Sequence, residues 1–338
     1  MVSWVPLLAM ALMCWIFSAG QPQRLPIAVW NEDGASPLSR QLVRMLEATP
    51  GFARDVQRGA GASVALLHNA QLATHSSLLQ RDVRQVVGTL SAGVEMQALA
   101  KRGTPARALQ LRVEPIRTQL VALFNVSTNY EQFLATTLVP ALVHILAMTA
   151  GAWSVGRELR DRTLGQWLHG AGGAAAVLAA LLGKLLAPLA LLWASALACL
   201  LYLSQLRGWA VAGSLAWIAL GLALLVAVSL AAGAALAGLT LSLRTAMSGA
   251  GLLSAPAFAF SGVGFPLLAM SGSARTWAEA MPYTHYARLQ IEQWQMGAPP
   301  AQSLPVVAGL LLATLALLAL ATVGLLRGLR RPERWGAR

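Results

Sequence analysis

The feature that most constrains this chain is a series of long apolar stretches, each almost free of charge, that follow residue 132. Each is long enough to cross about 30 Å of hydrocarbon as a helix rising about 1.5 Å per residue. The runs are continuously apolar and rich in Ala and Leu, which favours helices over the alternating pattern of a β-barrel. The predicted spans lie at 133–153, 184–205, 209–236, 248–270 and 304–326.

Composition supports a membrane protein. Hydrophobic residues make up 57% of the chain and charged residues 11%, whereas a soluble domain is about a quarter charged. The net charge of +12 would suggest nucleic-acid binding in a soluble protein. Here it is explained by the basic loops that orient membrane helices, so we expect no nucleic-acid partner.

Cysteine and histidine usage points away from metal chemistry. Cys14 and Cys199 both lie inside apolar runs, so we expect two small buried hydrophobic side chains rather than a disulfide. The sequence has no Cys/His cluster with metal-ligand spacing, and we predict no metal site.

An earlier apolar run, Trp4–Ser18, is short for a membrane span. It could be a signal peptide, because Ser18-Ala19-Gly20 offers small residues for cleavage. A signal peptide normally begins with basic residues, which Met1-Val2-Ser3 lacks. We therefore predict that residues 1–20 form the first transmembrane helix.

Residues 21–131 differ from the rest, because Pro, Asp, Glu, Arg and Gln occur throughout and no run has membrane length. Buried strands are predicted at 25–30 and 64–67, and 113–121 is extended or mixed. Helical spacing between 76 and 100 places six apolar residues on one face, namely Leu78, Val83, Val86, Val87, Leu90 and Val94. This segment is predicted to be an α/β extracytoplasmic domain inserted between the first and second spans.

Arginines in the short loops set the orientation, because they collect on the cytoplasmic side. With a cytoplasmic N-terminus, nine lie inside and only Arg207, Arg275 and Arg288 lie outside. The fold class is thus an all-α polytopic membrane protein with six transmembrane helices and both termini cytoplasmic. Residues 132–338 form its five-helix domain, with a charged cytoplasmic segment at 156–172 and a basic C-terminal tail. The inside arginines are Arg157, Arg160, Arg162, Arg244, Arg327, Arg330, Arg331, Arg334 and Arg338.

Three stretches together carry a family resemblance. The first, at 25–44, joins an apolar strand to an acidic turn and a Ser-Arg helix. The second, at 157–168, is a charged run that leads to Leu182-Gly183-Lys184. The third pairs 260–270, rich in Gly and Phe, with Met-Pro-Tyr-Thr-His-Tyr at 281–286. In this order they resemble the ABC type-2 permease family, the membrane subunits of ATP-driven exporters with a large external loop.

The resemblance implies that the second stretch is where an ATPase subunit docks. The residues that it assigns to ATPase coupling are Arg157, Glu158, Arg160, Asp161, Arg162, Thr163 and Trp167. An ordinary solvated loop with orienting arginines is the alternative. The chain has no Gly-x-x-x-x-Gly-Lys-[Ser/Thr] motif, so ATP and Mg²⁺ are expected on a separate ABC ATP-binding subunit. Gly183 is expected to be a packing glycine and Lys184 a lysine that extends to the membrane surface.

One histidine is a further candidate. His285 lies between Tyr283 and Tyr286 and could relay protons or contact substrate. An interfacial anchor is the more common role for a histidine among aromatic residues at a membrane boundary.

The resulting hypothesis is a non-catalytic permease subunit in a bacterial inner membrane, dimeric with itself or a paralogue. The resemblance implies export of a drug (multidrug efflux), a lipid or a polymer precursor, with a periplasmic adaptor protein as a further partner besides membrane lipid. An apolar path with little buried charge suits a lipophilic or amphipathic substrate. The alternative is a membrane-anchored sensing or envelope-interaction protein without transport activity. A membrane enzyme and a secondary transporter are disfavoured, because catalytic motifs and intramembrane acids are missing from the sequence.

Overall fold

The structure, a computed structural model, describes residues 62–69, 77, 80–81, 83–93, 116–124 and 130–335. Contacts divide the chain into two compact units, Gln21–Asn129 and a second unit of Met1–Gly20 with Tyr130–Arg338. The predicted first span at 1–20 and the predicted strand at 25–30 lie outside the described residues.

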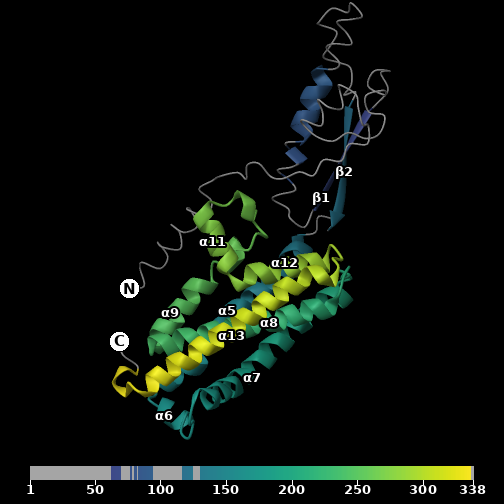
Figure 1. Ribbon diagram of the computed structural model, residues 1–338. Coiled ribbons are helices and arrows are strands. Elements are labelled where there is room, and N and C mark those ends of the chain that lie inside the picture. Colours follow the sequence, from purple (N-terminus) through teal and green to yellow (C-terminus); the bar gives the residue numbers. More distant parts are fainter. Residues whose placement is uncertain are drawn as a thin grey trace, which may run out of the picture. The chain divides into compact units, whose positions relative to one another are not determined.

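Nine α-helices make up the described part of the helical unit (Figure 1). Four are long and apolar enough to cross a membrane: Ala135–Arg160, Ala174–Leu206, Leu215–Thr240 and Pro300–Leu329. The second of these combines α7 with a terminal π-helical turn, η2 (Tyr202–Leu206). The α-helices are α5 (Tyr130–Arg160), α6 (Leu164–Trp167), α7 (Ala174–Leu201), α8 (Leu215–Thr240), α9 (Leu243–Ser254), α10 (Ala257–Phe260), α11 (Gly272–Ala280), α12 (Pro282–Trp294) and α13 (Pro300–Leu329).

The predicted spans 133–153 and 304–326 fall on α5 and α13, whereas the span predicted at 209–236 belongs to α8, which begins later, at Leu215. The span predicted to begin at 184 belongs to α7, which begins earlier, at Ala174. Cys199, expected to be buried, is exposed on this helix.

The predicted span at 248–270 is wrong as a single helix. The chain breaks after α9, where Pro256 has no N–H to continue the ladder. It breaks again after α10, where Gly262 adopts a left-handed φ of 84°. A short 3₁₀ turn, η3 (Leu267–Ala269), follows before α11. The described residues therefore hold four candidate spans, and six transmembrane helices are not confirmed.

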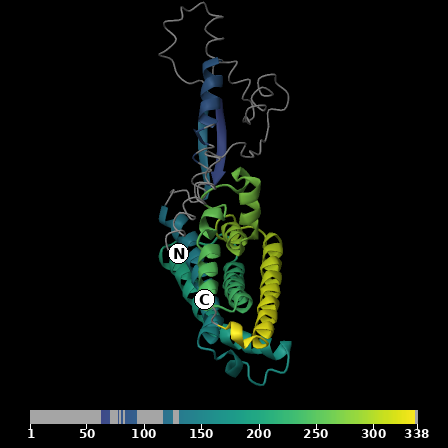
Figure 2. The ribbon, with the colours of Figure 1, turned by 90° about the vertical axis from the view of Figure 1, so that its left-hand side faces the viewer.

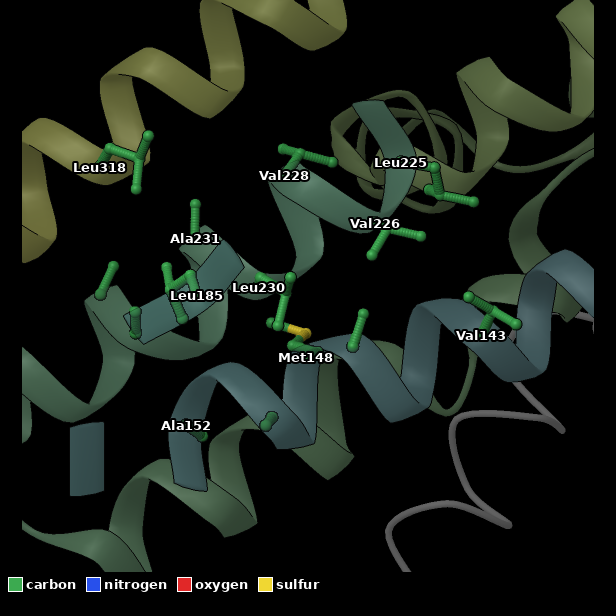
Figure 3. Close-up of a cluster of buried hydrophobic side chains, with 14 of the residues drawn as sticks. Val143, Met148, Ala152, Leu185, Leu225, Val226, Val228, Leu230, Ala231 and Leu318 are labelled. Carbon is green, nitrogen blue, oxygen red and sulfur yellow. The ribbon is translucent and has the colours of Figure 1, made fainter. Parts of the chain in front are cut away.

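Helix α8 is the centre of the helical unit. Figures 1 and 2 show it enclosed by its neighbours, and it packs against α5, α7, α9, α12 and α13. Its buried residues lie on every face, as expected for a helix that is apolar all round. Figure 3 shows Leu230 of α8 beside Met148 of α5, and the same cluster includes Leu225 and Val226 of α8, Val143 of α5, Leu185 of α7 and Leu318 of α13.

Glycines let the backbones of these helices approach closely. A Cβ on Gly233 of α8 would lie 2.0 Å from the carbonyl oxygen of Met148, and one on Gly151 of α5 would lie 2.1 Å from that of Leu230. At the other contact, a Cβ on Gly324 of α13 would lie 2.7 Å from the carbonyl carbon of Gly238. Small residues at helix crossings allow dense packing, which is the main force between helices in lipid.

In the other unit, β1 (Ala62–Asn69) pairs in parallel with β2 (Ile116–Phe124), with Ala62 opposite Ile116. The predicted strand at 64–67 lies within β1, and that at 113–121 overlaps β2. Residues 83–93 are helical, and Val83 and Val87, one turn apart, are buried. A parallel pair with helical residues between its strands agrees with an α/β segment, but the α/β fold of 21–131 as a whole stays a prediction.

Replacing Gly233 with Ala is expected to destabilise the helical unit, because two packed backbones must separate to admit the new Cβ. Overpacking of this kind lowers the free energy of unfolding by about 1–3 kcal/mol. The measurement is the thermal unfolding midpoint of the purified chain in detergent. Gly309→Ala in α13 is the control, since nothing lies within 4 Å of a Cβ added there. Equal midpoints for the two variants would contradict the close α5–α8 contact.

Candidate functional site

The charged segment predicted to couple to an ATPase forms the end of α5, a tight turn and α6. The backbone N–H of Thr163 donates to the carbonyl oxygen of Glu158 at 2.8 Å, and Asp161 N–H donates to that of Arg157 at 2.9 Å. Arg162 completes the turn with a left-handed φ of 58°. This conformation costs a non-glycine residue about 1–2 kcal/mol, so the surrounding contacts must hold the turn.

Glu158 is the centre of those contacts. Its carboxylate accepts hydrogen bonds from the Lys184 ammonium of α7 and from the Thr163 hydroxyl beside α6. The Arg157 guanidinium lies 3.4 Å away. The side chains of Glu158 and Lys184 are each only 13% exposed. One carboxylate thus ties the end of α5 to α6 and α7, and its partial burial makes the ionic contact stronger than one in water.

Trp167 closes the same cluster. The Lys184 ammonium lies 4.1 Å from the centre of the Trp167 ring, a distance suited to a cation–π contact. The side chains of Glu158, Thr163 and Trp167 therefore belong to one cluster with Lys184.

The other four predicted residues point outward. Arg157, Arg160, Asp161 and Arg162 are all exposed. Arg160 and Asp161 form a two-pronged ion pair at 2.7 and 3.1 Å. The hydrogen bond from Arg160 lowers the pKa of the Asp161 carboxyl below its usual value. The segment thus presents a mixed-charge outer face.

Helix α6 is held from its apolar side. Leu164 and Leu168 are buried, and Leu164 lies beside Gly328 near the end of α13. The Trp335 indole N–H donates to the carbonyl oxygen of Gly328 at 2.8 Å, and a Cβ on Gly165 would lie 3.5 Å from the Trp335 ring. These contacts hold α6 against the end of α13.

Sequence reasoning missed two members of this site. Lys184 was expected to extend to the membrane surface, but it pairs with Glu158 instead. The available signal was a lone lysine inside an apolar stretch, where a charge needs a partner. Trp335 offered a weaker signal, as an aromatic residue within a basic tail.

Two histidines lie elsewhere in the helical unit. His285 is exposed, and its Nε2 lies 2.7 Å from the carbonyl oxygen of Glu279, a contact that joins α12 to α11. Its role as an interfacial anchor stays a prediction. His144, which sequence reasoning did not single out, is buried in α5 with Nδ1 2.7 Å from the Ser229 hydroxyl of α8.

The site is an exposed charged face, joined by a partly buried ionic cluster to α5, α6 and α7. A family model for ABC-2 family transporter proteins matches residues 49–323, which is most of the chain. A search of curated proteins and a search of solved structures each gave no match.

Replacing Glu158 with Gln is expected to destabilise the chain, because the Lys184 ammonium would stay partly buried without its carboxylate. Losing a charged hydrogen bond of this kind costs about 2–3 kcal/mol. Adding Lys184→Met to that variant should recover part of the loss. Denaturant unfolding of the single and double variants measures the coupling.

Asp161→Asn is the matched control. It removes an ion pair whose side chains are about half exposed, and such pairs contribute less than about 1 kcal/mol. The central place of Glu158 would be refuted if the changes in unfolding free energy caused by Glu158→Gln and Lys184→Met were additive. It would also be refuted if Asp161→Asn lowered the unfolding free energy as much as Glu158→Gln does.

Proposed function

This chain belongs to the ABC-2 family of transporter proteins, and we propose that it is the permease subunit of an ATP-driven exporter. Membership implies a membrane transport subunit that works with an ABC ATP-binding partner. The four candidate spans agree with a multi-pass membrane protein. In this proposal the chain carries no cofactor, and ATP and Mg²⁺ bind to the separate ATPase.

The single observation that carries the coupling proposal is the link from an exposed charged face to three helices through Glu158. In the proposal, the exposed side chains of Arg157, Arg160, Asp161 and Arg162 contact the ATPase. Glu158, Thr163 and Trp167 act behind them and pass the displacement to α5 and α7. Mixed charges suit a soluble partner, since complementary charges give specificity and a defined register.

We also propose six membrane passes with both termini in the cytoplasm of a bacterial cell. The described spans supply four. The pair α9 and α10, covering 243–260, would supply a fifth, because a helical path of that length rises about 27 Å. Residues 1–20 would supply the sixth, and 21–131 would form the external α/β domain.

The substrate in this proposal is lipophilic or amphipathic, such as a drug, a lipid or a polymer precursor. Support comes from the spans, whose described side chains are mostly apolar. The transporter would sit in the inner membrane as a dimer of two permease copies or of paralogues, in contact with lipid. The external domain would be the place for a periplasmic adaptor.

Affinity purification from native membranes, followed by mass spectrometry, tests the partner. The tagged chain should recover a P-loop ATPase. Replacing Arg160, Asp161 and Arg162 together with Ala should lower the recovered ratio at least about tenfold, which corresponds to about 1.4 kcal/mol of binding energy. These three side chains are exposed, so the fold should persist.

The control replaces Arg275 and Arg288 with Ala. Both are exposed and paired with glutamates, and they lie on α11 and α12, away from α6 in Figure 1. This variant should keep the ATPase. A wild-type preparation without any ATPase would overturn the proposal and favour the sensing or anchoring alternative.

A further inference from the structure

Pro140 lies inside α5 and leaves a gap in its hydrogen-bond ladder. In an α-helix each N–H donates to the carbonyl oxygen four residues earlier. Proline has no N–H, so the carbonyl oxygen of Thr136 loses the donor that residue 140 would supply. Thr136 and Thr137 are both only 1% exposed, and a buried carbonyl without a hydrogen-bond donor is costly.

Two side chains of α12 reach this part of α5. The Gln290 amide donates to the Thr136 carbonyl oxygen, the one that Pro140 deprives of its usual donor. The Tyr283 hydroxyl donates to the neighbouring Thr137 carbonyl oxygen at 2.6 Å. Gln290 and Tyr283 lie two turns apart on one face of α12, and both are buried. Together they attach α12 to the segment of α5 that precedes Pro140.

A second buried glutamine on α12 has different hydrogen-bond partners. Gln293 donates through its amide to the Ser303 hydroxyl and to the Ala298 carbonyl oxygen, and its own side-chain oxygen accepts from the backbone of Ser214. These bonds join α12 to the first turn of α13 and to the segments that precede α8 and α13. Of these two buried glutamines on α12, only Gln290 is placed to donate to the Thr136 carbonyl oxygen.

We propose that Gln290 and Tyr283 are positioning residues that fix the first part of α5 to α12, which makes Pro140 the hinge about which the rest of α5 moves during transport. Glu158, near the end of the moving part, lies about 27 Å along the helix from Pro140 at 1.5 Å per residue. A helix without one of its ladder bonds bends most readily at that place. Displacement at the coupling site would thus become a change of angle at Pro140. The hinge rests on the proposed transport function, whereas the attachment of α12 to α5 does not.

The attachment is tested on the full chain alone by a double-mutant cycle. Gln290→Met keeps the side-chain length but removes the donor, and it should lower the unfolding midpoint in detergent by about 2–4 °C, the shift expected for loss of one buried hydrogen bond. Pro140→Ala restores an N–H to the Thr136 carbonyl. In that background, Gln290→Met should lower the midpoint by less than half as much.

Gln293→Met is the matched control, because it makes the same change on the same helix. It also loses buried hydrogen bonds, but none to Thr136, so its effect should be the same in the wild-type chain and in the Pro140→Ala background. The attachment is supported if the Pro140→Ala background reduces the loss of unfolding midpoint caused by Gln290→Met but not that caused by Gln293→Met. Equal rescue of both variants, or rescue of neither, overturns it.

The hinge is tested in the complex with the ATPase, reconstituted in nanodiscs and supplied with Mg-ATP. Pro140→Ala should lower ATP turnover several-fold while the ATPase subunit stays bound, because conformational steps limit turnover in such machines. Unchanged turnover with the subunit bound overturns the hinge. Failure of the wild-type chain to bind any ATPase would refute the proposed function instead, and would leave the result of the cycle intact.

Discussion

The close approach of α8 to α5 and α13 is the constraint on which the rest of the helical unit depends. In lipid there is little hydrophobic gain in bringing helices together, so contact area and backbone approach must supply the attraction. Gly233 and Gly151 remove the side chains that would separate α8 from α5, and Gly238 and Gly324 do the same toward α13. Because α8 is enclosed in this way, the ends of the surrounding helices have defined positions. The charged segment at the end of α5 is therefore held in a defined position as well.

Polar contacts in the described part of the unit join helices to one another at defined points. Glu158 joins α5, α6 and α7 through Lys184 and Thr163. Gln290 and Tyr283 join α12 to α5 at the opposite side of Pro140 from that cluster. A low-dielectric surrounding strengthens each such contact and makes its loss costly. Apolar packing thus provides the adhesion between helices, and these polar contacts fix their register.

The amino-acid sequence predicts much of this arrangement. Long apolar runs located α8 and α13, and the charged run at 157–168 located the site segment. The predicted span at 248–270 was wrong, because hydropathy measures apolarity and not the backbone breaks at Pro256 and Gly262. The partner of Lys184 could not be predicted either, since an ion pair between residues 26 positions apart depends on how two helices pack. For the same reason, Pro140 was visible in the sequence but the donor on α12 that compensates for it was not.

In the proposed transporter, the α6 end of the helical unit receives an ATPase. Photo-crosslinking tests it most directly, with p-benzoylphenylalanine placed at Gln166 of α6 and, for comparison, at Gln302 of α13. Both glutamines are exposed, and neither belongs to the charged cluster. We expect a crosslink from position 166 to a P-loop ATPase in native membranes and none from position 302. A P-loop ATPase crosslinked from neither position, or from position 302 alone, would refute docking at the α6 end.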